Sequence, residues 1–308
     1  MKRFAKWLLL VVFVLAGLAA VAITFTIGWR PFLGPKARPL TARTFERTPQ
    51  RLERGRYIAT ALSGCIYCHS PHDWNAPETP LIPDREGAGE VEPYADLPGR
   101  IVAPNLTPDP ETGSGRWTDD QLARAIREGI GHDGRALFPL MPYQHYRRMS
   151  DEDVASVVVY IRSLPPLRNA LPPTEIIFPV KYLIRSAPEP VTSFVPDLPS
   201  SSSPIERGAS LVNLAGCSDC HTPQEKGQEI PGMAFAGGFP FSGPWGNVTT
   251  ANITPDPSGI SYYDEALFLQ VMRTGSVKAR KLSPIMPVQV YKNLSDDDLN
   301  TMFAYLRT

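Results

Sequence analysis

Apolar residues are unevenly distributed along this 308-residue chain. An uncharged, mostly apolar stretch runs from Trp7 to Trp29, with three basic residues before it and Arg30 after it. A stretch of this length can cross a bilayer as a helix, whereas the apolar part of a cleaved signal peptide is about 7–15 residues long. We therefore predict a transmembrane anchor over residues 1–30. A signal peptide cut near Ala20 or Ala22 is the alternative, and both place the remaining chain on the periplasmic side of a bacterial inner membrane.

Two later segments have the apolar spacing of amphipathic helices. Four apolar residues at i, i+3, i+4 and i+7 occur twice, as Val154, Val157, Val158 and Ile161 and as Leu299, Met302, Phe303 and Leu306. This spacing predicts one buried face on each helix, packed against the opening helix of its own domain.

Polar residues indicate where helices begin and end. Thr48-Pro49 predicts the start of a helix that runs towards Ser63-Gly64. Thr118 to Gln121 has the form of a capping box, and Gly129 is placed to end the helix that follows. Ser150 is expected to cap the helix that carries the first apolar stripe.

The chain repeats itself with offsets of 145 to 153 residues. The paired segments are Arg54-Gly55 and Arg207-Gly208, Asn105 to Pro110 and Asn252 to Pro257, Met141 to Tyr146 and Met286 to Tyr291, and Ser150 to Asp153 and Ser295 to Asp298. Such self-similarity means that one structural unit is used twice. We predict two domains, over residues 45–165 and 205–308, joined by a Pro/Ser-rich linker over residues 166–204.

Composition fits compact helices joined by irregular chain, because 33 residues are proline. The linker contains an apolar piece, residues 176–184, which is expected to pack across both domains or to dock on a partner or the membrane surface. In the first domain, residues 70–100 form a long loop that is a candidate docking element or simply surface padding.

Formal net charge is zero, but the charges are segregated. Residues 1–44 contain seven of the 31 basic residues and none of the 31 acidic ones, so the remaining body is acidic. This favours a partner with a basic face, with an even scatter of solvated acids as the alternative, and nothing indicates nucleic-acid binding.

All four cysteines belong to two copies of Cys-x-x-Cys-His. The copies are Cys65-Ile66-Tyr67-Cys68-His69 and Cys217-Ser218-Asp219-Cys220-His221. This motif is the attachment site of c-type haem, in which the cysteines form thioethers and the histidine ligates the iron. Two covalently bound haems are therefore expected.

A zinc site, a redox dithiol and structural disulfides account for the cysteines less well. Neither zinc binding nor dithiol chemistry needs a histidine directly after each pair, and no βαβ pattern surrounds either copy. Structural disulfides leave the same histidines unexplained.

Helices around a haem motif, followed by a methionine loop, resemble a class I cytochrome c domain in each half. The resemblance covers residues 45–165 and 205–308 and implies a mainly α fold, with two tandem domains after the N-terminal transmembrane helix. It also implies that the motif histidine ligates one face of each haem and a loop methionine the other.

The repeat itself indicates which methionine that is. An offset of 145 places Met286 on Met141, whereas Met302, Met272 and Met149 have no methionine counterpart. Proline follows both members of the pair and blocks helix formation, which fits a loop. We predict Met141 with His69 and Met286 with His221 as axial ligands, the alternative being that a methionine is ordinary core filling.

Three further histidines of the first half are candidates to replace Met141. His132 and His145 correspond to positions near Val277 and Val290, and His72 lies only three residues after His69. We expect His72, His132 and His145 to be surface or propionate-side residues.

The Asn105 to Pro110 element, with Trp117 and the Met-Pro-Tyr loop, is similar to the cytochrome c subunits of bacterial membrane-bound alcohol and gluconate dehydrogenases. Those subunits typically carry three haem motifs. The resemblance implies electron relay between a dehydrogenase, or a quinol-oxidising complex, and another carrier. Asn105, Thr107 and Trp117 are expected to bond haem propionates or to form an ordinary turn. The alternative function is a dihaem enzyme with a catalytic haem, peroxidase-like or thiosulfate-oxidising.

Overall fold

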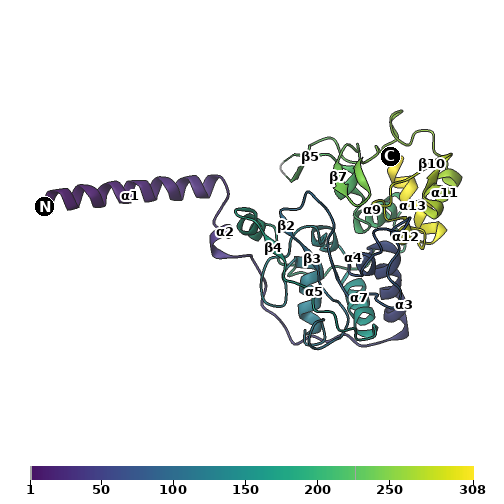
Figure 1. Ribbon diagram of the computed structural model, residues 1–308, viewed down its shortest axis with the longest axis horizontal. Coiled ribbons are helices and arrows are strands. Elements are labelled where there is room, and N and C mark those ends of the chain that lie inside the picture. The colour runs from purple at the N-terminus through teal and green to yellow at the C-terminus, as the bar shows by residue number, and fades with distance from the viewer. Residues whose placement is uncertain (1, 226) are drawn as a thin grey trace.

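The computed structural model describes residues 2–225 and 227–308. Figure 1 shows two helical bodies side by side and a long N-terminal helix that projects away from them. This helix, α1 (Lys2–Phe25), is long and apolar enough to cross a membrane, and its most apolar window is not buried against the rest of the protein. The prediction of a helix over this apolar stretch is confirmed.

Residues 45–165, called unit one below, are mainly helical. Their elements are α3 (Pro49–Tyr57), the π-helical turn η1 (Ile58–Leu62), α4 (Cys65–Cys68), β1 (Glu90–Val91), β2 (Gly99–Arg100), β3 (Val102–Ala103), α5 (Asp119–Glu128), α6 (Tyr143–Tyr146) and α7 (Asp151–Ser163). β1 and β3 form a short antiparallel pair.

Residues 205–308, called unit two, repeat the order of the main helices but differ in their strands. Their elements are α9 (Pro204–Leu214), α10 (Cys217–His221), β5 (Gln224–Glu225), β6 (Gln228–Glu229), β7 (Pro240–Gly243), β8 (Gly246–Thr249), α11 (Glu265–Thr274), β9 (Ser276–Val277), β10 (Arg280–Lys281), α12 (Val288–Tyr291) and α13 (Asp296–Leu306). The strands pair antiparallel in sequence order, and β7 with β8 forms the longest of these hairpins.

The helix boundaries follow from side-chain caps. Thr48 accepts a hydrogen bond from the Arg51 backbone, and Thr118 and Gln121 form a complete capping box. Gly129 ends α5 in a left-handed conformation, which costs glycine little. Ser150 caps α7 as predicted.

The opening and closing helices of each unit cross very closely. A Cβ added at Gly55 would lie 1.9 Å from the Ser156 carbonyl oxygen, and one at Gly208 would lie 2.0 Å from the Thr301 carbonyl oxygen. The glycine of each repeated Arg-Gly pair therefore allows α3 to cross α7 and α9 to cross α13. The predicted pairing of the closing and opening helices is confirmed. The closest contacts come from Ser156 and Thr301, and the apolar stripes lie in the hydrophobic core.

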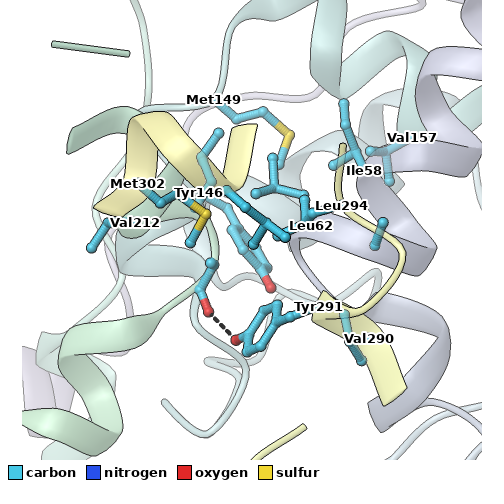
Figure 2. Close-up of a cluster of buried hydrophobic side chains, with 14 of the residues drawn as sticks. Ile58, Leu62, Tyr146, Met149, Val157, Val212, Val290, Tyr291, Leu294 and Met302 are labelled. Atoms are coloured by element: carbon cyan, nitrogen blue, oxygen red, sulfur yellow. Dashed lines mark hydrogen bonds between the residues drawn. The ribbon is translucent and has the colours of Figure 1, made fainter. Parts of the chain in front are cut away.

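The two units share one continuous apolar core. Figure 2 shows Leu62 and Met149 of unit one in the same cluster as Val290, Leu294 and Met302 of unit two. Because apolar side chains of both units pack in one cluster, the units form parts of one body, and the interface is held by apolar burial.

The contact between the units is reciprocal. α6 of unit one lies against α9 of unit two, and α12 of unit two lies against η1 of unit one. His145 in α6 bonds to Asp219 through Nε2 (2.7 Å) and to Asn213 through Nδ1 (3.0 Å). Its counterpart Val290 lies beside Gly64. α6 and α12, which are repeats of each other, therefore make equivalent contacts with the opposite unit.

The loop over residues 70–100 is not surface padding. Trp74 and Tyr94 pack against Trp245 with ring centroids 5.7 and 5.1 Å apart, and the Ala95 amide donates to the Ser242 carbonyl (3.0 Å). The loop docks on the β7–β8 hairpin of unit two. The expectation of padding was wrong because aromatic side chains within the loop find apolar partners in the other unit.

The chain between the units packs on unit one and on the segment after α1. β4 (Glu175–Ile176) pairs with β2, and α8 (Val180–Leu183) and the 3-10 turn η2 (Ile184–Ser186) contact α2 (Arg30–Leu33). The expectation that the apolar piece spans both domains is not met, because its partner is the segment that leads out of α1.

Candidate cofactor sites

Each Cys-x-x-Cys-His motif forms a short helical turn behind a left-handed glycine. Gly64 (φ +61°) precedes α4 and Gly216 (φ +67°) precedes α10. A side chain at either position would be strained, so the glycine lets the chain turn sharply from the opening helix into the motif. The motif of unit one therefore follows α3 and η1 directly, and the motif of unit two follows α9.

Both motif histidines have one ring nitrogen fixed by the backbone. Nδ1 of His69 lies 2.8 Å from the Pro104 carbonyl oxygen, and Nδ1 of His221 lies 2.7 Å from the Ala251 carbonyl oxygen. This bond keeps the proton on Nδ1 and leaves Nε2 available as a ligand. Burial lowers the pKa of both rings, which favours the neutral form that binds metal.

The repeated Asn-Leu/Ile-Thr-Pro-Asp-Pro element sets the position of these carbonyls. Asn105 Oδ1 accepts hydrogen bonds from the amide and hydroxyl of Thr107 (2.9 and 2.7 Å). Asn252 Oδ1 makes the same two bonds to Thr254 (2.8 and 2.7 Å). The turn expected from this composition is confirmed, and it begins directly after the carbonyl that holds each histidine. A role in binding propionates stays a prediction.

A buried tyrosine ties each methionine loop to the motif of its own unit. Tyr146 donates to the Ser63 carbonyl (2.8 Å), and Tyr291 donates to the Ala215 carbonyl (2.6 Å). Burial raises the pKa of both phenols well above its usual value, so they remain donors. Sequence reasoning missed these contacts, although tyrosine at the same place in both repeats was the available signal.

Met141 and Met286 are partly buried beside the shared core. Met149, Met272 and Met302 are buried within that core, as Figure 2 shows for Met149 and Met302. The three core methionines pack as ordinary apolar side chains. Met141 and Met286 lie instead on irregular chain just before α6 and α12, which agrees with the loop positions predicted for ligands.

The remaining histidines have other partners. His72 is buried, with Nδ1 2.6 Å from Glu90 and its ring against Tyr67 and Trp74. His72 is not the surface residue that was one of the two expectations, because a carboxylate and two aromatic rings enclose it; a propionate-side position stays a prediction. His132 is exposed and stacks on Trp117, and His145 bridges the units.

The four cysteines are unpaired, so no disulfide accounts for them. Burial raises the pKa of the Cys65, Cys217 and Cys220 thiols to about 12. Within residues 2–225 and 227–308, no group of three or more His, Cys, Asp or Glu side chains is placed to hold a metal ion.

This donor set fits a covalently attached haem in each unit. Each site offers two adjacent sulfurs, an oriented imidazole with Nε2 unused, and a methionine on a loop tied to the motif.

Comparison with known proteins agrees with this geometry. The family model described as "Cytochrome c" matches residues 52–165 and 205–308, one region in each unit. A protein of Cereibacter sphaeroides named "Diheme cytochrome c-type" is 29% identical over 95% of this chain and 96% of its own length.

Two other relatives are subunits of larger enzymes. The cytochrome c subunit of a quinone-dependent alcohol dehydrogenase from Gluconobacter oxydans is 29% identical over 83% of this chain and 54% of its own length. The cytochrome subunit of a fructose dehydrogenase from Gluconobacter japonicus is 30% identical over 83% of this chain and 52% of its own length. The chain thus spans about half the length of these two proteins.

Proposed function

Since the chain belongs to the cytochrome c family, we propose that it is a membrane-anchored dihaem protein that relays single electrons on the periplasmic side of a bacterial inner membrane. Cys65 with Cys68, and Cys217 with Cys220, attach the haems. His69 and His221 are the proximal ligands. Met141 and Met286 complete the two sites as the distal ligands.

The orientation of the two motif histidines carries this proposal. When bound, haem supplies a one-electron couple at its iron. The protein holds each imidazole by a backbone carbonyl and each methionine loop by a buried tyrosine hydroxyl. Histidine–methionine ligation raises the reduction potential and leaves no open coordination position, which suits electron passage rather than substrate chemistry.

The interface supports transfer between the two sites. Asp219, within the second motif, is bonded to His145 of unit one, and Gly64, which precedes the first motif, lies against Val290 of unit two. Both motifs therefore adjoin the shared core. Cys65 and Cys217 pack against that core, which holds the two motifs in one body.

The membrane assignment rests on α1 and its flanks. The helix has the length and composition of a membrane span, and basic residues precede it. By the positive-inside rule that flank stays in the cytoplasm, so both units emerge on the periplasmic side. The dehydrogenase subunits among the relatives suggest a membrane-bound dehydrogenase as the electron donor.

Intact mass of the protein purified from membranes tests the haem count and the anchor together. The expected mass is that of the whole chain plus two haems. A missing haem would contradict the attachment sites. A chain beginning just after Ala20 or Ala22 would show that the N-terminal helix is a cleaved signal.

Carbon monoxide binding separates the relay from the dihaem enzyme. Reduced protein is expected to bind carbon monoxide only slowly, because both distal positions are filled. The structure gives the enzyme no support at His72 or His145, whose rings are engaged with Glu90 and with Asn213 and Asp219. Rapid binding together with peroxide turnover would favour the enzyme.

A further inference from the structure

Two short segments far apart in the sequence pack together at the foot of α1. α2 begins five residues after the last residue of α1, and it contacts α8 and η2 of the inter-unit chain. Arg185 donates to the Pro31 carbonyl (3.0 Å) and thereby joins them, and Pro31 is buried beneath this contact. Figure 1 shows α2 at the base of the long helix, on the side of the body that faces it.

This junction exposes a concentration of large apolar side chains. Its most exposed member is Phe178, at 77%. The exposed apolar residues of α2, α8 and their flanks, together called the junction surface, are Ile27, Trp29, Phe32, Leu33, Ile177, Phe178, Tyr182 and Leu183. Aromatic pairs organise it, with ring centroids 6.2 Å apart for Trp29 and Phe32 and 6.1 Å for Phe178 and Tyr182. Exposed apolar groups gathered in this way mark an interaction site.

The two segments that form the junction surface carry only positive charges. Residues 26–44 and 176–187 contain six basic residues and no acid. Arg38 and Arg43 are used internally, in ion pairs with the buried carboxylate of Asp120. Arg30, Lys36, Lys181 and Arg185 remain at the surface, and the cationic groups of Lys181 and Arg185 lie 5.0 and 4.7 Å from the Tyr182 ring.

We propose that the junction surface lies in the interfacial layer of the bilayer that α1 crosses. Tryptophan and tyrosine rings beside a membrane span, flanked by lysine and arginine, are the composition that favours this layer. The basic residues match anionic phospholipid headgroups. The surface is continuous with α1, which makes the bilayer its occupant. This inference rests on the proposed function, because it requires that α1 is retained.

The junction surface is firmly attached to unit one. β4 pairs with β2, and the Ile177 amide donates to the Pro98 carbonyl (2.9 Å). On the other side, Arg38 binds Asp120 through two nitrogens and Glu128 through Nε (2.7 Å). Contact with the membrane at this surface therefore fixes the orientation of unit one, so that α1 is not a loose tether.

Spin labels on the whole holoprotein in nanodiscs test the proposal. Each disc contains one protein copy and a mixture of zwitterionic and anionic phospholipids. Phe178→Cys and Leu183→Cys carry the label on the junction surface. Phe194→Cys and Leu198→Cys, with 74% and 51% exposure in the same linker, are the controls. The native cysteines are bound to haem and do not react with the label.

Collision rates with a water-soluble nickel chelate and with oxygen are then measured. Labels at residues 178 and 183 should collide with the chelate roughly tenfold less often than the controls, because a polar solute is excluded from apolar surroundings. Oxygen, which partitions into lipid, should show the opposite ranking.

Three results would overturn the proposal in distinguishable ways. If the protein remains in the disc but all four labels meet the chelate equally, the anchor stands and the junction surface does not touch lipid. If the protein does not enter the disc, both the anchor and this inference are wrong. The third result uses concentrated protein in detergent without lipid. If the labels at residues 178 and 183 are protected there as well as in the disc, and their spectra show dipolar broadening between copies, the occupant is a second copy.

Discussion

The close crossing of α9 and α13 predicts a measurable cost for adding one methyl group. In Gly208→Ala, the new Cβ would lie 2.0 Å from the Thr301 carbonyl oxygen, whereas ordinary contact begins at 3.4 Å. The two helices must therefore separate by about 1.4 Å at the crossing. The obstacle is backbone, which cannot rotate away as a side chain can.

Two opposing terms set the size of the effect. Alanine is favoured over glycine within a helix by about 1 kcal/mol. Overpacking of a well-filled interior costs about 1–3 kcal/mol, and a backbone obstacle places this site at the upper end. The net loss in free energy of unfolding is therefore about 2 kcal/mol. Because α9 ends three residues before Cys217, the second haem should also be disturbed.

Guanidinium denaturation followed by circular dichroism measures the loss, and hydrogen exchange localises it to unit two. Ser210→Ala, on the same helix, adds no atom and is the control. Gly55→Ala is the equivalent change in unit one, where the distance to the Ser156 carbonyl oxygen is 1.9 Å. If Gly208→Ala unfolds within about 0.5 kcal/mol of wild type, the range of an ordinary surface substitution, the crossing is not as close as described.

Three further predictions concern other contacts. Met141→Leu and Met286→Leu should each abolish the weak sulfur-to-iron absorption band of one haem and lower its potential, while an unchanged spectrum would reject that ligand. Burial opposes protonation of His145, but bonds to Asp219 and Asn213 outweigh it and raise its pKa. The stability that this contact adds is therefore present below pH 6.5 and lost as pH rises through the raised pKa, and denaturation of His145→Gln should lack that dependence. Arg38→Met leaves the buried Asp120 with Arg43 as its remaining ion-pair partner, beside two hydrogen bonds from Thr41, and should cost about 3 kcal/mol in thermal denaturation, against little change for the exposed Arg168→Met.

Much of the fold was predictable because its signals are local. Capping residues gave the starts of α3, α5 and α7, and the period of apolar residues gave the buried faces of α7 and α13. The repeat showed that the same unit occurs twice. The caps and the apolar stripes each lie within a few residues of the element that they predict.

The contacts that were not predictable join residues far apart in the chain. Nothing near His72 in the sequence indicates that Glu90 will bond to it, or that Trp74 will meet Trp245. In the same way, residues 176–184 were recognised as too apolar for a free linker, but their partner α2 lies about 150 residues earlier. Pairing of this kind depends on tertiary packing, which a single sequence does not reveal.

The candidate sites were predictable in part. The motifs indicated which residues are candidates to hold the cofactor, and the repeat indicated one methionine pair. The carbonyls of Pro104 and Ala251, which orient His69 and His221, were not foreseen, because a backbone acceptor has no signature of its own. The repeated Asn-x-Thr-Pro-Asp-Pro element, which begins directly after each carbonyl, was the only sequence signal near these acceptors.

Electron transfer within one molecule tests the central claim most directly. A pulse of reductant that supplies less than one electron per protein should be followed by a redistribution between the two haems, seen as a spectral change. The rate of that change should be independent of protein concentration, because the two motifs adjoin one shared core. A rate proportional to concentration would mean that electrons pass only between molecules, and would contradict a relay within the chain.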